Sequence, residues 1–144
     1  MRHILKDQPE AATLTVDSAG TAGYHIGALP DPRSRQALTD RGYAGWSQAR
    51  QVTAEDFRQF DYIFAMDEQN VRDLGKICPD PALFTKVKRL SSFAHKHSVA
   101  KVADPYYGGP EDFAAMVLLL EDACLGVWLD LIQPELSRKL AGTT

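Results

Sequence analysis

The 144-residue sequence predicts an α/β fold, a doubly wound parallel sheet with helices on both faces. Segments with helical periodicity alternate along the chain with short runs of strand length. One of these runs, Asp61 to Met66, is apolar throughout its interior, which indicates a strand buried on both faces. No repeat, low-complexity segment or linker divides the sequence, and its length suits one domain. We therefore expect a single domain over residues 1–136, followed by a loose tail over 137–144.

The elements predicted at the start of the chain are short. Residues 1–6 fit the last turns of a helix that ends before Pro9, or equally a frayed terminus. Thr13 to Val16 is rich in β-branched residues and predicts a strand. Asp17 to Thr21 then forms a polar turn, and such a turn at the carboxyl end of a parallel strand is where ligands bind in open α/β sheets.

Capping residues mark two helices in the middle of the chain. Asp31 predicts the N-cap of a helix with Pro32 at its first position, and Gly42 suits the residue that follows this helix. Thr53 to Asp56 resembles a capping box and predicts a short helix through Phe57.

The second half of the chain continues the alternation. Asp67 ends the buried run and predicts the cap of a helix from Glu68 to Leu74. Val87 to Leu90 predicts a weaker strand, with Ser92 as its furthest limit. The last helix begins near Pro110. Its apolar stripe recurs at helical spacing, and we assign it to the core: Phe113, Met116, Val117, Leu120, Cys124, Val127 and Leu131.

Composition excludes several classes of function. The net charge of −3 gives no general attraction to nucleic acid, and acids interrupt the longest apolar stretch, so we expect no membrane span. Two cysteines without a disulfide framework indicate a reducing compartment, and we expect the cytoplasm. His95 and His97 have no carboxylate or cysteine beside them in the sequence, which predicts a solvated loop and no metal site.

The loop before the last helix, residues 102–113, holds the strongest candidate for a functional site. Pro105 fixes its own φ angle and pushes Asp104 toward extended geometry, which holds the Asp104 carboxylate at a loop apex. Tyr106 and Tyr107 offer two flat aromatic walls with hydroxyl tips, and the two glycines that follow allow positive φ angles. This loop would suit a general acid at the mouth of an aromatic pocket; an ordinary surface turn is the alternative.

The same loop resembles the general-acid loop of the low-molecular-weight protein tyrosine phosphatases. Three further stretches agree with that family in the same order: Val16 to Thr21, Ala49 to Phe57 and Phe60 to Asp67. Pro30 to Arg33 also fits, so the likeness runs from about Leu14 to the last helix. It implies the phosphotyrosine phosphatase I-like fold. It also implies a reaction in which a cysteine thiolate attacks a phosphate monoester and forms a cysteinyl-phosphate.

The resemblance assigns roles to four residues of this sequence. Asp104 would protonate the leaving phenol and then activate water. Tyr106 and Tyr107 would wall the substrate pocket, with Tyr24 opposite them; an unconstrained surface tyrosine is the alternative for Tyr24. The expected substrate is a phosphotyrosine protein or a small aryl phosphate, and no cofactor is implied.

The family's nucleophile and phosphate loop, a cysteine followed after five residues by an arginine, have no match in this sequence. The cysteines are Cys78 and Cys124, and six positions after them stand a phenylalanine and an aspartate. In the resemblance, Asp17 and Ser18 support the phosphate loop by hydrogen bonds; satisfying their own turn is the alternative role. We therefore expect the chain as printed to be inactive.

Three hypotheses remain open. The chain is a tyrosine phosphatase whose sequence begins after the family's first strand and phosphate loop, a non-catalytic homologue that binds a partner, or an arsenate reductase of the same fold. In the family, the first strand lies between the strands predicted at 13–16 and 61–65. Without it, we expect exposed sheet edges and a chain that is either marginally stable or rescued by oligomerisation or by strand rearrangement.

Overall fold

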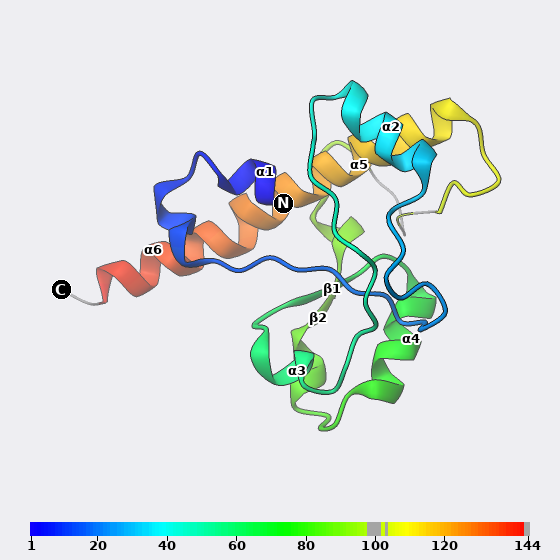
Figure 1. Ribbon diagram of the computed structural model, residues 1–144. Helices are drawn as coiled ribbons and strands as arrows, with labels where there is room; N and C mark the ends of the chain where they lie inside the picture. The colour runs from blue at the N-terminus through cyan, green and yellow to red at the C-terminus, as the bar shows by residue number, and fades with distance from the viewer. Residues whose placement is uncertain (98–101, 103, 143–144) are drawn as a thin grey trace.

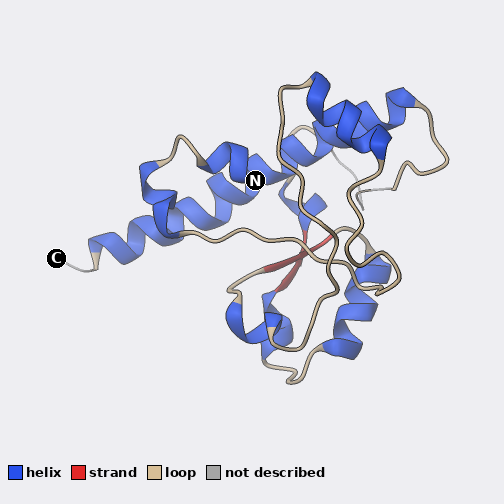
Figure 2. Ribbon diagram, in the orientation of Figure 1, coloured by secondary structure: helices blue, strands red, loops and turns tan. Residues whose placement is uncertain are grey.

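Figure 1 shows the computed structural model, which describes residues 1–97, 102 and 104–142. Ala103 of the predicted acid loop and the last two residues of the predicted tail lie outside the described residues. Helices and loops make up most of the described chain, and the two strands lie at its centre (Figure 2). The elements in order are α1 (Arg2–Leu5), η1 (Pro9–Thr13), α2 (Pro32–Asp40), α3 (Asp56–Gln59), β1 (Ile63–Ala65), α4 (Glu68–Ile77), η2 (Leu83–Lys86), β2 (Val87–Arg89), η3 (Leu90–Phe93), α5 (Pro110–Val127), η4 (Trp128–Ile132) and α6 (Gln133–Ala141).

The two strands form a parallel sheet. They pair in register from Ile63 opposite Val87 to Ala65 opposite Arg89, with α4 in the crossover between them. Side chains of β1 alternate between the two faces: Phe64 packs against one apolar cluster, and Ile63 and Ala65 belong to the other. Helices α3 and α4 lie on one side of the sheet and α5 on the other (Figure 1). The predicted α/β fold with helices on both faces is confirmed.

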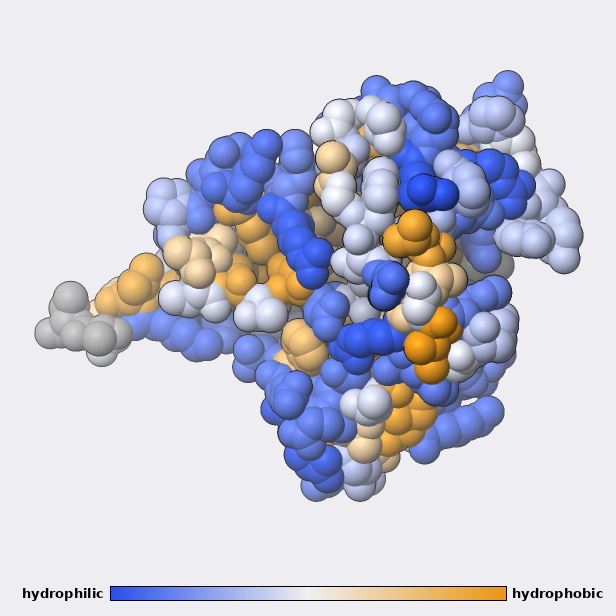
Figure 3. Space-filling view, in the orientation of Figure 1, coloured by the Kyte–Doolittle hydropathy of each residue, from blue (hydrophilic) through white to orange (hydrophobic). Residues whose placement is uncertain are grey.

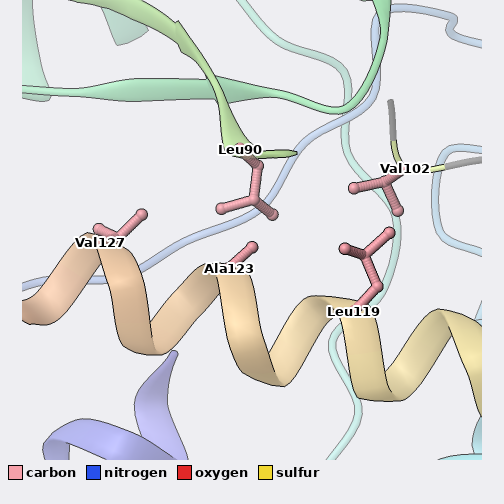
Figure 4. Packing of buried hydrophobic residues seen from close by; sticks show 5 residues of the cluster. All are labelled: Leu90, Val102, Leu119, Ala123 and Val127. Carbon is pink, nitrogen blue, oxygen red and sulfur yellow. The ribbon is translucent and has the colours of Figure 1, made fainter. Parts of the chain in front are cut away.

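The apolar core consists of two clusters, one on each face of the sheet. The first joins η3 to α5, and Figure 4 shows its members pointing toward one another: Leu90, Val102, Leu119, Ala123 and Val127. The second lies under α3 and α4 and contains Val52, Phe57, Ala65 and Leu74. Burial of apolar surface stabilises a fold by about 25 cal/mol per Å², so these clusters are the main force that holds the helices on the sheet.

The predicted core stripe of α5 is partly correct. Phe113, Val117 and Val127 are buried, and the other predicted members are only half-buried. Leu119 and Ala123 are buried instead, because α5 is covered by η3 as well as by α2. A helix that packs against two partners buries a wider face than a single stripe indicates.

The caps predicted for α2 and α4 are confirmed. The Asp31 carboxylate accepts a hydrogen bond from the Arg33 amide at 2.8 Å, and Asp67 accepts one from the Asn70 amide at 2.8 Å. Gly42 has φ of +83°, the left-handed conformation that glycine adopts without strain after a helix. Short-range signals of this kind depend only on residues within one turn, which is why the sequence locates these helix ends.

The strand predicted over Thr13 to Val16 is wrong. Thr13 ends the 3₁₀ helix η1, and the residues after it pair with no strand in the described part of the chain. The guanidinium of Arg2 instead donates to the Val16 carbonyl oxygen at 2.7 and 3.2 Å. β-branched residues favour extended geometry, but a strand also needs a neighbour for its hydrogen-bond ladder, and here none lies beside it.

Two other boundaries differ from the predictions. β2 ends at Arg89, and η3 replaces the end of the predicted strand. In the predicted loose tail, residues 137–141 are helical, because α6 continues to Ala141 with Lys139 paired to Glu135 at 2.9 Å. No helix in the described ranges combines the length and the apolar character that a membrane crossing requires.

Candidate functional site

A cavity of about 480 Å³ lies between the start of α2, the start of α5 and the chain that leads to α3. Asp104 and Tyr106 line it from the loop before α5, and Ser18 lines it from the turn after η1. Its other lining groups come from segments 19–34 and 47–50 and from Phe113. The structure thus brings together three of the six residues that the sequence singled out, from two segments far apart in the chain.

The Asp104 loop, residues 104–109, is a tight turn that opens on this cavity. The Gly108 amide donates to the Pro105 carbonyl oxygen at 2.7 Å, which closes the turn. Asp104 is exposed, and its Oδ1 accepts a hydrogen bond from the Tyr106 amide at 3.0 Å. The carboxylate is therefore fixed by its own loop while it faces solvent at the cavity, which is the position a proton donor to a bound ligand needs.

Gly108 of the Asp104 loop serves another purpose than the predicted one, and a Cβ atom at Gly109 would meet no atom within 4 Å. Positive φ angles in the described residues occur at Gly27, Gly42 and Gly45, and Gly109 has φ of −92°. A Cβ atom at Gly108 would lie 2.4 Å from an Asp112 carboxylate oxygen. That carboxylate accepts a hydrogen bond from the Gly109 amide at 3.0 Å and so caps α5. Close approach of the cap, not positive φ, requires the glycine.

Asp17 and Ser18 lie beside the cavity in a network that the sequence did not reveal. Asp17 Oδ1 accepts from the Ser18 amide at 2.8 Å, and Asp17 Oδ2 accepts from Arg50 Nε at 3.0 Å. Arg50 also donates from both terminal nitrogens to Asp56, at 2.9 and 3.0 Å. Asp56 is the buried carboxylate of this network, and the hydrogen bonds from Arg50 hold the pKa of Asp56 below its ordinary value. Arg50 stays charged and joins the turn at Ser18 to the start of α3.

Tyr24 and Tyr107 do not line the cavity. Tyr24 is 82% exposed, and its ring contacts the His25 ring in a tilted arrangement with ring centroids 4.2 Å apart. Tyr107 is 98% exposed, and its ring meets the Tyr106 ring edge to face at 5.0 Å. Both rings lie on chain segments next to the cavity, since His25 and Tyr106 are among its lining residues. In this structure both tyrosine rings are therefore exposed aromatic surface on segments that border the cavity.

Sequence reasoning missed several cavity residues, among them Arg50, His25 and the serines at 34 and 47. Arg50 stands inside a stretch that carried the family resemblance, so a charged residue at that position was the available signal. The two serines carry no such signal, because serine is common in surface turns of every kind.

Neither cysteine belongs to the cavity. Cys78 follows α4 and packs at the edge of the cluster under that helix, and its Sγ lies 3.1 Å from the Asp80 carbonyl oxygen. Cys124 packs against the cluster on the opposite face of the sheet. The two thiols therefore lie on opposite faces of the sheet and are no adjacent redox pair.

The segment around His95 and His97 is fixed by acids of the last helices, which differs from the solvated loop that the sequence predicts. His95 Nε2 lies 2.6 Å from Asp130 Oδ2, and His97 Nδ1 lies 2.8 Å from Asp122 Oδ2. Asp122 also accepts the backbone amides of residues 95, 96 and 97 at 2.8 to 2.9 Å. The histidines therefore bind carboxylates that lie 25 and 35 positions away in the sequence.

Comparison with known proteins shows which protein family shares this sequence and this architecture. The family model described as low molecular weight phosphotyrosine protein phosphatase matches residues 1–139. A Synechocystis sp. protein named for the same family is 44% identical over 115 residues, 78% of this chain and 72% of the relative. The Homo sapiens low molecular weight phosphotyrosine protein phosphatase is 39% identical over 118 residues, 78% of this chain and 71% of the relative.

Solved structures agree. A protein tyrosine phosphatase from Entamoeba histolytica, crystallised with Hepes in its active site, superimposes with a TM-score of 0.87 and is 35% identical. The match covers 93% of this chain and 85% of that chain. YfkJ from Bacillus subtilis superimposes with a TM-score of 0.77 at 31% identity, over 93% of this chain and 82% of that one. The chain therefore belongs to the low molecular weight phosphotyrosine protein phosphatase family.

Proposed function

We propose that the cavity beside Asp104 serves phosphotyrosine monoester hydrolysis and that Asp104 is the proton donor to the leaving phenol. The observation that supports this is the Asp104 loop, where a carboxylate held by the Tyr106 amide opens on a cavity next to an aromatic ring. A carboxylic acid placed within reach of the leaving oxygen contributes about 10² to 10⁴ to the rate of such a reaction.

We further propose that the printed chain does not complete the reaction by itself. Phosphate-monoester hydrolysis is among the slowest uncatalysed reactions, so a proton donor alone gives no measurable turnover. A nucleophile and a cationic anion site are also required, and both cysteines lie in the apolar clusters rather than at the cavity. Arg50 lines the cavity, but two carboxylates already neutralise it.

The test compares the 144-residue chain with a longer version that carries a Cys-x5-Arg segment ahead of Met1. With an aryl phosphate as substrate, we expect no turnover from the 144-residue chain and turnover from the longer one. In the longer version, Asp104→Asn should lower kcat by about 10² or more. Glu111→Gln, which changes an exposed acid a few residues away, is the matched control and should leave kcat unchanged.

Each outcome decides one part of the proposal. Turnover by the 144-residue chain would contradict its inactivity, and an unchanged kcat for Asp104→Asn would contradict the role of Asp104.

The exposed rings of Tyr24 and Tyr107 favour a second candidate function, that of a non-catalytic homologue that binds a partner protein. That candidate predicts no turnover in either version.

We also propose that the chain self-associates through its open sheet edge. β1 pairs with β2 along one edge, and in the described residues no strand covers its other edge. A hollow of about 560 Å³ lies between α1, η1 and the unpaired segment 14–16, where Figure 3 shows apolar surface. Unpaired edges and exposed apolar groups recruit other chains. Because the sequence carries two cysteines and no disulfide framework, we place this assembly in the cytoplasm.

A further inference from the structure

Arg33, in the first turn of α2, contacts the Asp104 loop through one guanidinium nitrogen and through the face of its guanidinium group. Nη1 donates a hydrogen bond to the Tyr106 carbonyl oxygen at 2.7 Å. The guanidinium carbon lies 5.2 Å from the centroid of the Tyr106 ring and 4.7 Å from the centroid of the Phe113 ring. A guanidinium over aromatic rings is attracted by their π-electrons as well as by hydrogen bonds. One side chain thus connects α2, the Asp104 loop and the first turn of α5.

Asp31 fixes the orientation of this guanidinium. Its Oδ1 accepts from Arg33 Nε at 3.1 Å, and its Oδ2 accepts from Arg33 Nη2 at 2.9 Å. The same Oδ1 caps α2 at the Arg33 amide, so the carboxylate is itself held by the helix. Two of the three guanidinium nitrogens are engaged in this way, and Nη1 is left to point at the loop. A lysine offers no planar fork and cannot make both sets of contacts at once.

The loop transmits this constraint to the Asp104 carboxylate. Tyr106 uses both of its backbone polar groups: its carbonyl oxygen accepts from Arg33, and its amide donates to Asp104 Oδ1 at 3.0 Å. Tyr107, the next residue of the loop, is exposed and meets the Tyr106 ring edge to face. Fixing the backbone of Tyr106 therefore fixes the group that orients Asp104.

We propose that Arg33 is the positioning residue of Asp104, acting through the backbone of Tyr106. The catalytic meaning of this inference rests on the proposed function of Asp104 as proton donor; the tether itself does not. A proton donor is effective only near its productive geometry, and small displacements of catalytic groups cost large factors in rate. α2 thereby becomes part of the site although Arg33 does not line the cavity.

Amide hydrogen exchange in the 144-residue chain, followed by NMR, tests the tether without any assay of turnover. We expect Arg33→Ala to speed exchange of the Tyr106 amide by about tenfold or more, because its acceptor on Asp104 is no longer held in place. Arg33→Lys keeps the charge and should restore only part of the protection. Arg41→Ala is the matched control: it removes an ion pair from the other end of α2 to Glu121 and should leave the Tyr106 amide unchanged.

The chemical shift of the same amide gives a second readout. Asp104→Asn changes the acceptor of this amide and should shift its resonance in the otherwise unsubstituted chain, and the shift should be smaller in the Arg33→Ala background. Equal exchange rates with and without Arg33, together with equal shifts in both backgrounds, would overturn the proposal. If Arg33→Ala does not fold, Arg33→Lys decides, and full protection in that variant contradicts the tether. Failure of the proposed function would instead appear as an unchanged kcat for Asp104→Asn, with the amide results intact.

Discussion

Single carboxylates connect distant parts of this protein. Asp122 on α5 is the clearest case. Its carboxylate accepts hydrogen bonds from three consecutive backbone amides and pairs with the His97 ring, and its side chain is only 7% exposed. Burial by itself would raise the pKa of Asp122, but the hydrogen bonds from His97 and the amides outweigh it and lower the pKa. Hydrogen bonds to a charged group are worth about 1.5–3 kcal/mol, so one such acid fixes a loop that has no secondary structure.

A neighbouring pair, His95 and Asp130, predicts a pH dependence of stability. The hydrogen bond that the His95 ring donates to the Asp130 carboxylate, and then the charge of that carboxylate, raise the pKa of His95 above its ordinary value of 6.5. A raised pKa means that the folded state binds the proton more tightly than the unfolded state. The stabilisation is therefore complete below pH 6.5 and is lost as the pH rises through the folded-state pKa.

Chemical denaturation of the 144-residue chain and of His95→Gln at several pH values checks this. We expect the two unfolding free energies to differ at pH 6 and to converge as the pH rises above the folded-state pKa of His95. His3→Gln serves as control, because His3 lies on α1 and its ring meets the Tyr43 ring edge to face, away from Asp130 in the sequence. A difference in unfolding free energy that grows with pH would contradict a stabilising hydrogen bond between His95 and Asp130.

At the scale of the elements, the packing of α5 on η3 depends on one glycine. A Cβ atom at Gly126 would lie 1.7 Å from the Phe93 carbonyl oxygen, which no side-chain rotation relieves because the contact is to backbone. Gly75 in α4 is a contrasting case, because a Cβ atom there would meet only the Phe84 ring at 3.8 Å, an ordinary contact.

Alanine at these two helix glycines should therefore have opposite effects. Gly126→Ala should lower the unfolding free energy by about 2–4 kcal/mol or prevent folding, since α5 must move away from η3. Gly75→Ala should raise it by roughly 0.5–1 kcal/mol, because alanine is the better helix former. Urea unfolding monitored by circular dichroism measures both. A stable Gly126→Ala variant would show that α5 does not pack this closely on η3.

At the scale of the whole molecule, the core is divided by a sheet of two strands. One cluster holds α5 and η3 against it and the other holds α3 and α4, while α6 buries no residue. The outer edge of β1 and the segment 14–16 have no ladder partner in the described chain. Such an arrangement leaves backbone groups and apolar surface available to a second molecule.

We expect the 144-residue chain to sediment as an oligomer whose proportion rises with concentration, and its melting temperature to rise likewise. Leu14→Lys, a charge placed in the hollow beside the open edge, should shift the equilibrium toward monomer. Leu140→Lys changes an exposed leucine of α6 and should not. A monodisperse monomer at every concentration, with a sharp melt, would refute self-association.

The amino-acid sequence alone predicts the alternation of helices and strands from α3 to α5, the caps at Asp31 and Asp67 and the glycine after α2. These features depend on residues within a few positions of one another, so local physical chemistry decides them. It also placed Asp104 and Tyr106 in one loop, and the structure shows both at one cavity.

Only the tertiary structure decided which distant groups meet. Arg33 reaches Tyr106 across 73 positions, Arg50 reaches Asp17 across 33, and the histidines reach acids on α5 and η4. The segment Thr13 to Val16 has the composition of a strand but lacks a partner, so it forms none. Hydrogen-bond ladders and ion pairs need two segments brought together by burial of apolar surface, and which segments those are depends on the packing of the whole chain.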